Sequence, residues 1–140
     1  MTLSIVGGTY IEYCFEPSYE ELWGSGLRAS CALSKKGFAI KFTSFVGEGD
    51  FESATGISET FEIESNFIKI EETIRWEYTH PLASPLAYSK VLANPRIDLQ
   101  LKEEIILYYG MIEANVKVTG EYVVYDPQND VPFSTTKSVA

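Results

Sequence analysis

Cysteine and histidine are scarce in this sequence of 140 residues, and their scarcity excludes several kinds of site. The two cysteines, Cys14 and Cys31, have no CxxC or Cys/His spacing around them. We therefore predict buried, reduced thiols, and we find no support for a zinc site or a disulfide. The single histidine, His80, precedes Pro81, and no serine or cysteine elbow motif lies nearby. A structural role at a strand end is predicted for it rather than catalysis.

Positive charge and long apolar runs are also lacking. Eleven Lys and Arg residues face 20 Asp and Glu residues, which gives a formal net charge of -9. A nucleic-acid surface needs clustered basic residues to replace the counterions of phosphates, so we predict no nucleic-acid partner. No apolar run approaches the ~18 residues of a membrane span, and no basic segment precedes one at the N-terminus. We expect a soluble, cytoplasmic protein.

The residues that are abundant indicate an ordinary globular chain. Hydrophobic residues make up 45% of the sequence and charged residues 22%, which is unlike a disordered protein. The aromatic fraction of 14% favours strands. A chain of this length buries about two-thirds of its unfolded surface without metals or disulfides. We predict one domain that spans residues 1–140.

The first third of the chain predicts a strand, a helix and a second strand. Leu3–Gly8 is a short apolar run that two glycines close, as in a buried strand with a tight turn. The helical pattern that follows begins at Ser25, which we predict to cap it, and ends before Gly37. Phe38–Gly47 is a second strand pattern. This unit predicts an α/β fold with a mainly parallel sheet.

A different pattern follows in Thr60–His80, where apolar and polar residues alternate. Ile74, Trp76 and Tyr78 fall on one face of a predicted strand and charged or hydroxyl residues on the other. Strands with one wet face do not suit the middle of a covered parallel sheet. We therefore predict a small antiparallel ribbon over residues 60–80 that stands off the main layer and acts as a lid or an oligomer interface.

The remaining segments are less regular. A proline-rich stretch predicts irregular chain with one helical turn around Leu86–Leu92. Two apolar runs, Glu103–Gly110 and Glu121–Gln128, each end in turn signals. The segment between them, Met111–Gly120, is predicted as a short helix or a loop.

Four segments in this order resemble the N-terminal half of the PfkB family, the ribokinase-like sugar and nucleoside kinases. They are "VGGTYIEY" at the first strand, "GSGLRASCALSKKG" at the helix, "FVGEGD" at the second strand and "VVYDPQ" near the C-terminus. The match covers nearly all of the chain but about half of a family member. The last residues predict the start of a helix capped by Ser134 or Thr135, so the sequence stops within that fold.

The resemblance implies a set of substrate-binding residues. The aspartate that binds substrate hydroxyls in the family corresponds to Glu12, whose longer side chain also carries a carboxylate. The family's glycine pair corresponds to Trp23 and Gly24, with Gly26 close behind. Its hydroxyl-binding asparagine corresponds to Arg28, which has donors only and suits an anionic group.

The resemblance also decides between two interpretations of "GEGD". The family's catalytic turn, Gly-Ala-Gly-Asp, lies near the C-terminus, whereas Asp50 directly follows the first strand, helix, strand unit. We therefore predict that Asp50 belongs to a substrate-side turn and is not a catalytic base. Glu48, Asp50 and Glu52 are predicted as a solvated acidic turn rather than a metal site. Glu113 is predicted as a surface carboxylate, because its neighbours reverse the order of the family's magnesium motif.

Two functions follow from these observations. The first is the substrate-binding and lid portion of a PfkB-like kinase, which would hold a sugar, nucleoside or phosphorylated small molecule, with Trp76 or Tyr78 covering it. No catalytic residue and no cofactor are predicted in this chain, and ATP and magnesium are expected only for a full-length kinase. The alternative is a non-catalytic binding or oligomerisation module that uses the antiparallel ribbon to pair with a partner or with a second copy of the chain. An unrelated soluble α/β domain is the third possibility.

Overall fold

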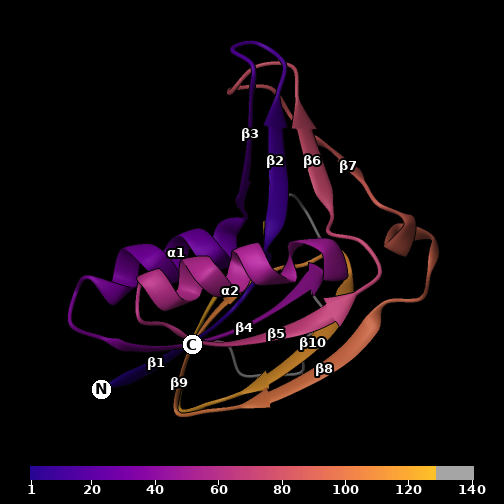
Figure 1. Cartoon of the computed structure of the whole chain (residues 1–140). Coiled ribbons are helices and arrows are strands. Elements are labelled where there is room, and N and C mark those ends of the chain that lie inside the picture. Colours follow the sequence, from indigo (N-terminus) through magenta and orange to yellow (C-terminus); the bar gives the residue numbers. More distant parts are fainter. Residues whose placement is uncertain (129–140) are drawn as a thin grey trace.

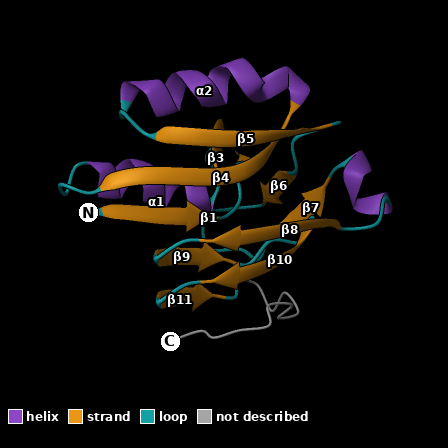
Figure 2. Ribbon diagram, turned by 90° about the horizontal axis from the view of Figure 1, so that it is seen from below, coloured by secondary structure: helices purple, strands orange, loops and turns teal. Residues whose placement is uncertain are grey.

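The computed structural model describes residues 1–128, and its centre is a five-stranded sheet. The order of its strands is β11-β9-β1-β4-β5, and every neighbouring pair is parallel (Figure 2). The predicted mainly parallel sheet is thus confirmed. The strands are β1 (Thr2–Val6), β4 (Ala39–Gly47), β5 (Glu64–Ile70), β9 (Ile105–Tyr109) and β11 (Tyr122–Asp126).

Two helices, α1 (Ser25–Ser34) and α2 (Phe51–Thr60), cover one face of this sheet (Figure 1). Leu27 and Cys31 of α1 join a core with Ile5 and Phe42 of the sheet beneath. Both predicted thiols are free and buried in the structure. Helix α1 confirms the predicted strand, helix, strand unit, whereas α2 has no counterpart in the predictions. Neither helix is long and apolar enough to cross a membrane.

The opposite face is covered by two parallel strands, β8 (Ile97–Lys102) and β10 (Ala114–Thr119) (Figure 1). Val116 and Val118 of β10 are fully buried and join a second core with Phe45 and Ile106. The prediction of a short helix or loop over Met111–Gly120 is therefore wrong. Alternate residues of β10 are buried, so the segment has the period of a strand that packs one face against a sheet.

A second, smaller sheet stands off the main body (Figure 1). Its order is β3-β2-β6-β7, with antiparallel pairing at both ends and parallel pairing between β2 and β6. The strands are β2 (Tyr10–Cys14), β3 (Tyr19–Trp23), β6 (Arg75–Tyr78) and β7 (Leu86–Tyr88). The chain thus enters this small sheet twice, once directly after β1 and once after β5.

The predicted small antiparallel sheet exists, but its boundaries differ from the predicted ribbon over residues 60–80. Residues 64–70 form β5, which pairs parallel with β4 in the main sheet. Only β6, within residues 60–80, belongs to the small sheet. Because β5 is an edge strand, it is part exposed and alternates like a ribbon strand. The alternation alone does not distinguish an edge strand from a lid strand.

Local signals at three turns also differ from the predictions. Ser25 does not cap α1; the N-cap is Gly24, whose φ of 88° favours glycine, and the carbonyl of Gly8 accepts the Gly26 amide. Gly37, also at φ 88°, follows the helix end as predicted. The segment around Leu86–Leu92 forms β7 and a short 3₁₀ turn over Lys90–Ala93. The predicted helix with Ser134 or Thr135 as a cap lies outside the described residues.

Candidate functional site

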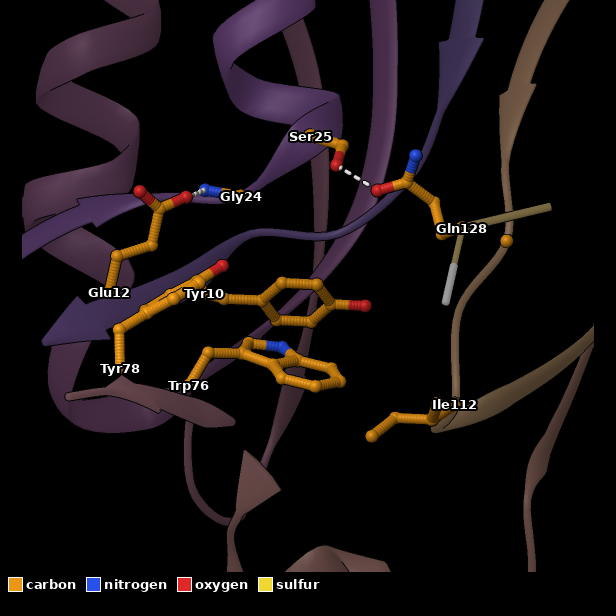
Figure 3. A pocket seen from close by; sticks show the side chains of 9 residues that line it. Tyr10, Glu12, Gly24, Ser25, Trp76, Tyr78, Ile112 and Gln128 are labelled. Carbon is orange, nitrogen blue, oxygen red and sulfur yellow. Dashed lines mark hydrogen bonds between the residues drawn. The ribbon is translucent and has the colours of Figure 1, made fainter. Parts of the chain in front are cut away.

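A small cleft lies where the small sheet meets the main sheet (Figure 3). It encloses about 50 Å³, which is room for a few water molecules. One wall comes from β2 and β6, a second from the start of α1, and a third from the segments after β9 and β11. Its lining residues are Tyr10, Glu12, Gly24, Ser25, Trp76, Tyr78, Gly110, Ile112 and Gln128.

The Glu12 carboxylate is fixed at the α1 side of the cleft. Its Oε2 accepts a hydrogen bond from the Gly24 amide at 2.9 Å (Figure 3), and its Oε1 accepts one from Arg28 Nη2 at 2.5 Å. Gly24 is buried and its backbone has a positive φ, so a glycine is required where the chain turns into α1. A carboxylate held in this way keeps free lone pairs that can accept bonds from ligand hydroxyl groups.

Aromatic side chains form the wall that comes from β2 and β6. The Tyr10 and Trp76 rings have centroids 5.9 Å apart and are tilted by 60°. Among residues 1–128, the buried indole Nε1 of Trp76 has no hydrogen-bond partner. Burial raises the pKa of Tyr78, and the nearby Glu12 carboxylate raises it further. The Tyr78 hydroxyl therefore keeps its proton at neutral pH and is available as a donor.

The third wall comes from segments far away in the sequence. The Ser25 hydroxyl donates to Oε1 of Gln128 at 2.5 Å, which ties the start of α1 to the end of β11 (Figure 3). Gln128 has a φ of 54°, a conformation that costs energy for a residue other than glycine. Gly110 and Ile112 complete this wall. Gly110 lies so close to Pro127 that a Cβ would lie 2.3 Å from the Pro127 carbonyl oxygen.

The structure brings together four of the six residues predicted from the sequence: Glu12, Gly24, Trp76 and Tyr78. Gly26 instead has a packing role, since an added Cβ would lie 2.7 Å from the Gly7 carbonyl carbon and from Phe42 Cε1. Arg28 lies beside the cleft, in an adjoining shallow depression, with its guanidinium 5.2 Å from the centroid of the Trp23 ring.

Five lining residues were not predicted from the sequence, although three of them have a local sequence feature that points to the cleft. Tyr10 lies two residues before Glu12 on the same face of β2, and Gly110 ends an apolar run. Ser25 belongs to the segment that supplied Gly24. Ile112 and Gln128 carried no local signal, because only the pairing of β11 with β9 brings their segments to the cleft.

Asp50 lies outside the cleft and has a structural contact. Its Oδ2 accepts a hydrogen bond from the Thr73 hydroxyl at 2.6 Å, and Thr73 Oγ1 accepts one from the Gly47 amide at 2.8 Å. This chain of bonds joins the end of β4 to the segment before β6. The acidic turn does not fit a magnesium ion either, since within residues 1–128 no three Asp, Glu, His or Cys side chains converge.

The fold was compared with those of known structures. A pyrophosphate-dependent kinase of the ribokinase family, in complex with a pyrophosphate analogue and myo-inositol, aligns with 89% of this chain at a TM-score of 0.56 and 10% identity. The nucleoside kinase of Methanocaldococcus jannaschii, a member of the ribokinase family, aligns with 93% at a TM-score of 0.58 and 14% identity. The chain has part of the ribokinase-like fold. A sugar kinase from Pyrococcus horikoshii aligns with 83% of this chain at a TM-score of 0.55 and 10% identity.

The likeness is one of fold and covers part of each relative. The aligned region spans 48% of the pyrophosphate-dependent kinase and 54% of both the nucleoside kinase and the sugar kinase. The chain therefore spans about half the length of these kinases. No family model matches the sequence, and no curated protein matches it.

Proposed function

We propose that this chain is the substrate-binding and lid portion of a ribokinase-like carbohydrate or nucleoside kinase. The observation that carries the proposal is the position of Glu12. Its carboxylate is held by the Gly24 amide at the start of α1, and it lines the same cleft as Trp76 and Tyr78 of the neighbouring strand β6. A fixed acceptor beside aromatic side chains suits a ring that carries several hydroxyl groups.

The cleft offers complementary groups for such a ligand. Glu12 accepts hydrogen bonds from hydroxyl groups, whereas the unpaired Trp76 indole donates one to a ring or hydroxyl oxygen. The faces of Tyr10 and Trp76 cover the C–H groups of a sugar or cyclitol. The fold neighbours point to the same class, since one was solved with myo-inositol and another is a nucleoside kinase.

The small sheet acts as the lid of this site. As it stands, the cleft has room for a few water molecules and is too small for a sugar. The small sheet therefore has to open from the segments after β9 and β11 before a ligand enters, and it closes over the ligand afterwards. Trp76 and Tyr78 belong to β6, so their contacts with the ligand form when the small sheet closes.

Transfer of a phosphoryl group requires a second part of the fold. Bound ATP and magnesium supply the phosphoryl group and offset its charge. In residues 1–128 no acidic cluster fits a magnesium ion, and the carboxyl group that lines the cleft, Glu12, is hydrogen-bonded to Arg28 and to the Gly24 amide. We propose that a second half packs at β11, an edge strand of the main sheet, where Tyr122 and Val124 are 56% and 60% exposed.

Titration with polyols and nucleosides tests the proposal. The chain is titrated with myo-inositol and with adenosine while backbone amides are followed by NMR. We expect saturable shifts at Gly24 and Ser25, and we expect Glu12→Ala to abolish them. A matched control is Glu21→Ala, which removes an exposed carboxylate opposite Glu12 on β3. If neither ligand shifts these amides, or Glu12→Ala binds as well as the natural chain, the proposal is wrong.

Exposed apolar side chains favour a second function, self-assembly through the small sheet. Leu86 and Tyr88 are exposed on β7, the strand at one edge of the small sheet. A second copy of the chain that pairs with the β7 edge would cover them. Sedimentation velocity of Leu86→Ser, with Leu82→Ser as a control 92% exposed and outside the strands, tests this function. A dimer lost only in Leu86→Ser supports it, and a monomer at all concentrations contradicts it.

A further inference from the structure

A second pocket shares no lining residue with the cleft, and the hydrogen bond from Tyr10 to Glu113 links the two. It encloses about 240 Å³ between the end of β5, the segment before β8 and the start of β10. Its apolar walls include Ile70, Val91 and Ile97, and its polar lining includes Asn94 and Glu113. The pocket is large enough for a small organic molecule, unlike the cleft.

Glu113 is the unusual member of this lining. Its side chain is 5% exposed, and Oε1 accepts a hydrogen bond from the Tyr10 hydroxyl at 3.0 Å. Oε2 is buried and has no hydrogen-bond partner among residues 1–128. A buried acceptor without a donor costs about 1–3 kcal/mol, so such atoms are rare unless they have a use.

The two cationic side chains near Glu113 have partners of their own. Arg96 is close enough to favour the ionised carboxylate, but its Nη1 donates to Asn115 at 3.5 Å. Lys69 lines the same pocket, but its ammonium group lies 4.4 Å from the centroid of the Phe51 ring. Burial raises the pKa of Glu113 to about 7, and the nearby amides of Glu113 and Ile112 offset part of this rise. The carboxyl group is therefore poised to ionise when a cation approaches it.

We infer that this pocket binds a small molecule with an apolar body and a protonated amine, whose N–H donates to the free Glu113 oxygen. The amine supplies the donor that Oε2 lacks, and its positive charge is matched by the ionised carboxylate. The apolar body packs against Ile70, Val91 and Ile97. The exposed Glu71 carboxylate offsets the charge of Lys69, which lines the same pocket.

This site is independent of the proposed kinase function, because no residue of the inference holds the sugar or nucleoside. The two sites touch at one bond, from Tyr10 to Glu113. An amine that ionises Glu113 strengthens that bond and holds the Tyr10 ring in the cleft wall. Binding of an amine in this pocket is thus expected to affect the closure of the small sheet, but that closure does not require the amine.

The test uses benzylamine as the probe and benzyl alcohol as its neutral counterpart. Each is titrated into the chain at pH 8 while the amides of Ile70, Val91, Asn94 and Ile97 are followed by NMR. We expect benzylamine to shift these amides in a saturable manner and to bind at least about tenfold more tightly than benzyl alcohol, because only the amine forms a charged pair with Glu113.

Two variants separate binding from folding. Glu113→Gln keeps the size of the side chain and is expected to weaken benzylamine binding by about tenfold or more. Ile97→Lys places a competing ammonium group at a part-exposed position of the pocket and is expected to abolish binding. Glu121→Gln, an exposed and distant carboxylate, is the control and should bind normally. Equal binding of the amine and the alcohol, or unchanged binding in Glu113→Gln, overturns the inference.

Discussion

Glu12 and Arg28 form an ion pair beside the cleft, in which Arg28 Nη2 donates to Glu12 Oε1 at 2.5 Å. The sequence suggested that Arg28 would attract an anionic ligand. In the structure, its charge is offset by the same carboxylate that would accept ligand hydroxyl groups. The pair is half exposed on the Arg28 side, so it contributes about 0–1 kcal/mol to stability and breaks at little cost when a ligand enters.

The hydrogen bond from the Gly24 amide to Glu12 is expected to contribute more to stability than the ion pair does. Glu12→Ala removes the acceptor of the buried Gly24 amide and is expected to lower the free energy of unfolding by about 1–3 kcal/mol. Glu12→Gln keeps an acceptor oxygen for Gly24 and loses only the ion pair, so it is expected to cost about 1 kcal/mol or less. Urea unfolding of the two variants checks this order. Equal losses would show that Gly24 does not depend on Glu12.

Gly26 packs against the Gly7 backbone and Phe42 in the structure, and its substitution tests this packing role. Gly26→Ala places a Cβ 2.7 Å from the Gly7 backbone and from Phe42, so we expect a loss of about 1–3 kcal/mol, with α1 pushed from β1. Gly56→Ala is the matched control, because Gly56 lies in α2 with open space around its Cβ. That change is expected to stabilise the chain by about 0.5–1 kcal/mol through helix propensity. Thermal unfolding of both variants measures the contrast, and similar shifts would refute it.

Burial of Glu113 predicts a specific pH dependence of stability. The pKa is about 7 in the folded chain and near 4.5 when exposed, so between these values the folded state binds the extra proton. The stability that the protonated group provides is complete below pH 4.5 and is lost as the pH rises towards 7. Between pH 5 and pH 8, the free energy of unfolding of the natural chain should fall by about 2–3 kcal/mol more than that of Glu113→Gln. Urea unfolding at both pH values measures this, and parallel pH profiles would contradict the burial of Glu113.

Asp50 is predicted to matter for stability and not for ligand binding. Asp50→Ala removes the acceptor of the Thr73 hydroxyl, and we expect a loss of about 1–2 kcal/mol. Binding of polyols in the cleft should not change, since Asp50 does not line it. Thr73→Val, which breaks the same chain of bonds from the other side, should have a similar effect. A loss of ligand binding at unchanged stability would show that Asp50 acts in the site.

The sequence predicted those parts of the fold that depend on local pattern. Apolar runs with glycine ends gave β1 and β4, and the helical spacing of Leu27 and Cys31 gave α1. The positions of β5 and β10 in the fold were not predicted, because they depend on which neighbouring element covers each strand. Alternation signals a strand with one covered face, but not whether the main sheet, the small sheet or a neighbouring strand covers it.

The same limit applies to the candidate site. Glu12 and Gly24 were found through their resemblance to a family motif, and both face the cleft. Gln128 was missed because its place opposite Ser25 depends on the parallel pairing of β11 with β9. Glu113 was predicted to be a surface carboxylate, which is wrong. It is buried because β10 covers the second core, and β10 was not predicted.

Tryptophan fluorescence measures the central claim, that the cleft holds a hydroxylated ring under the small sheet. The chain has two tryptophans, so Trp23→Phe leaves Trp76 of the cleft as the only one. Two proteins are titrated with myo-inositol, adenosine and a sugar phosphate: the Trp23→Phe variant, and the same variant with the additional change Glu12→Ala. We predict a saturable change in Trp76 emission for at least one ligand, lost in Glu12→Ala. No change with any of the three ligands, or a change that Glu12→Ala leaves intact, would contradict the account.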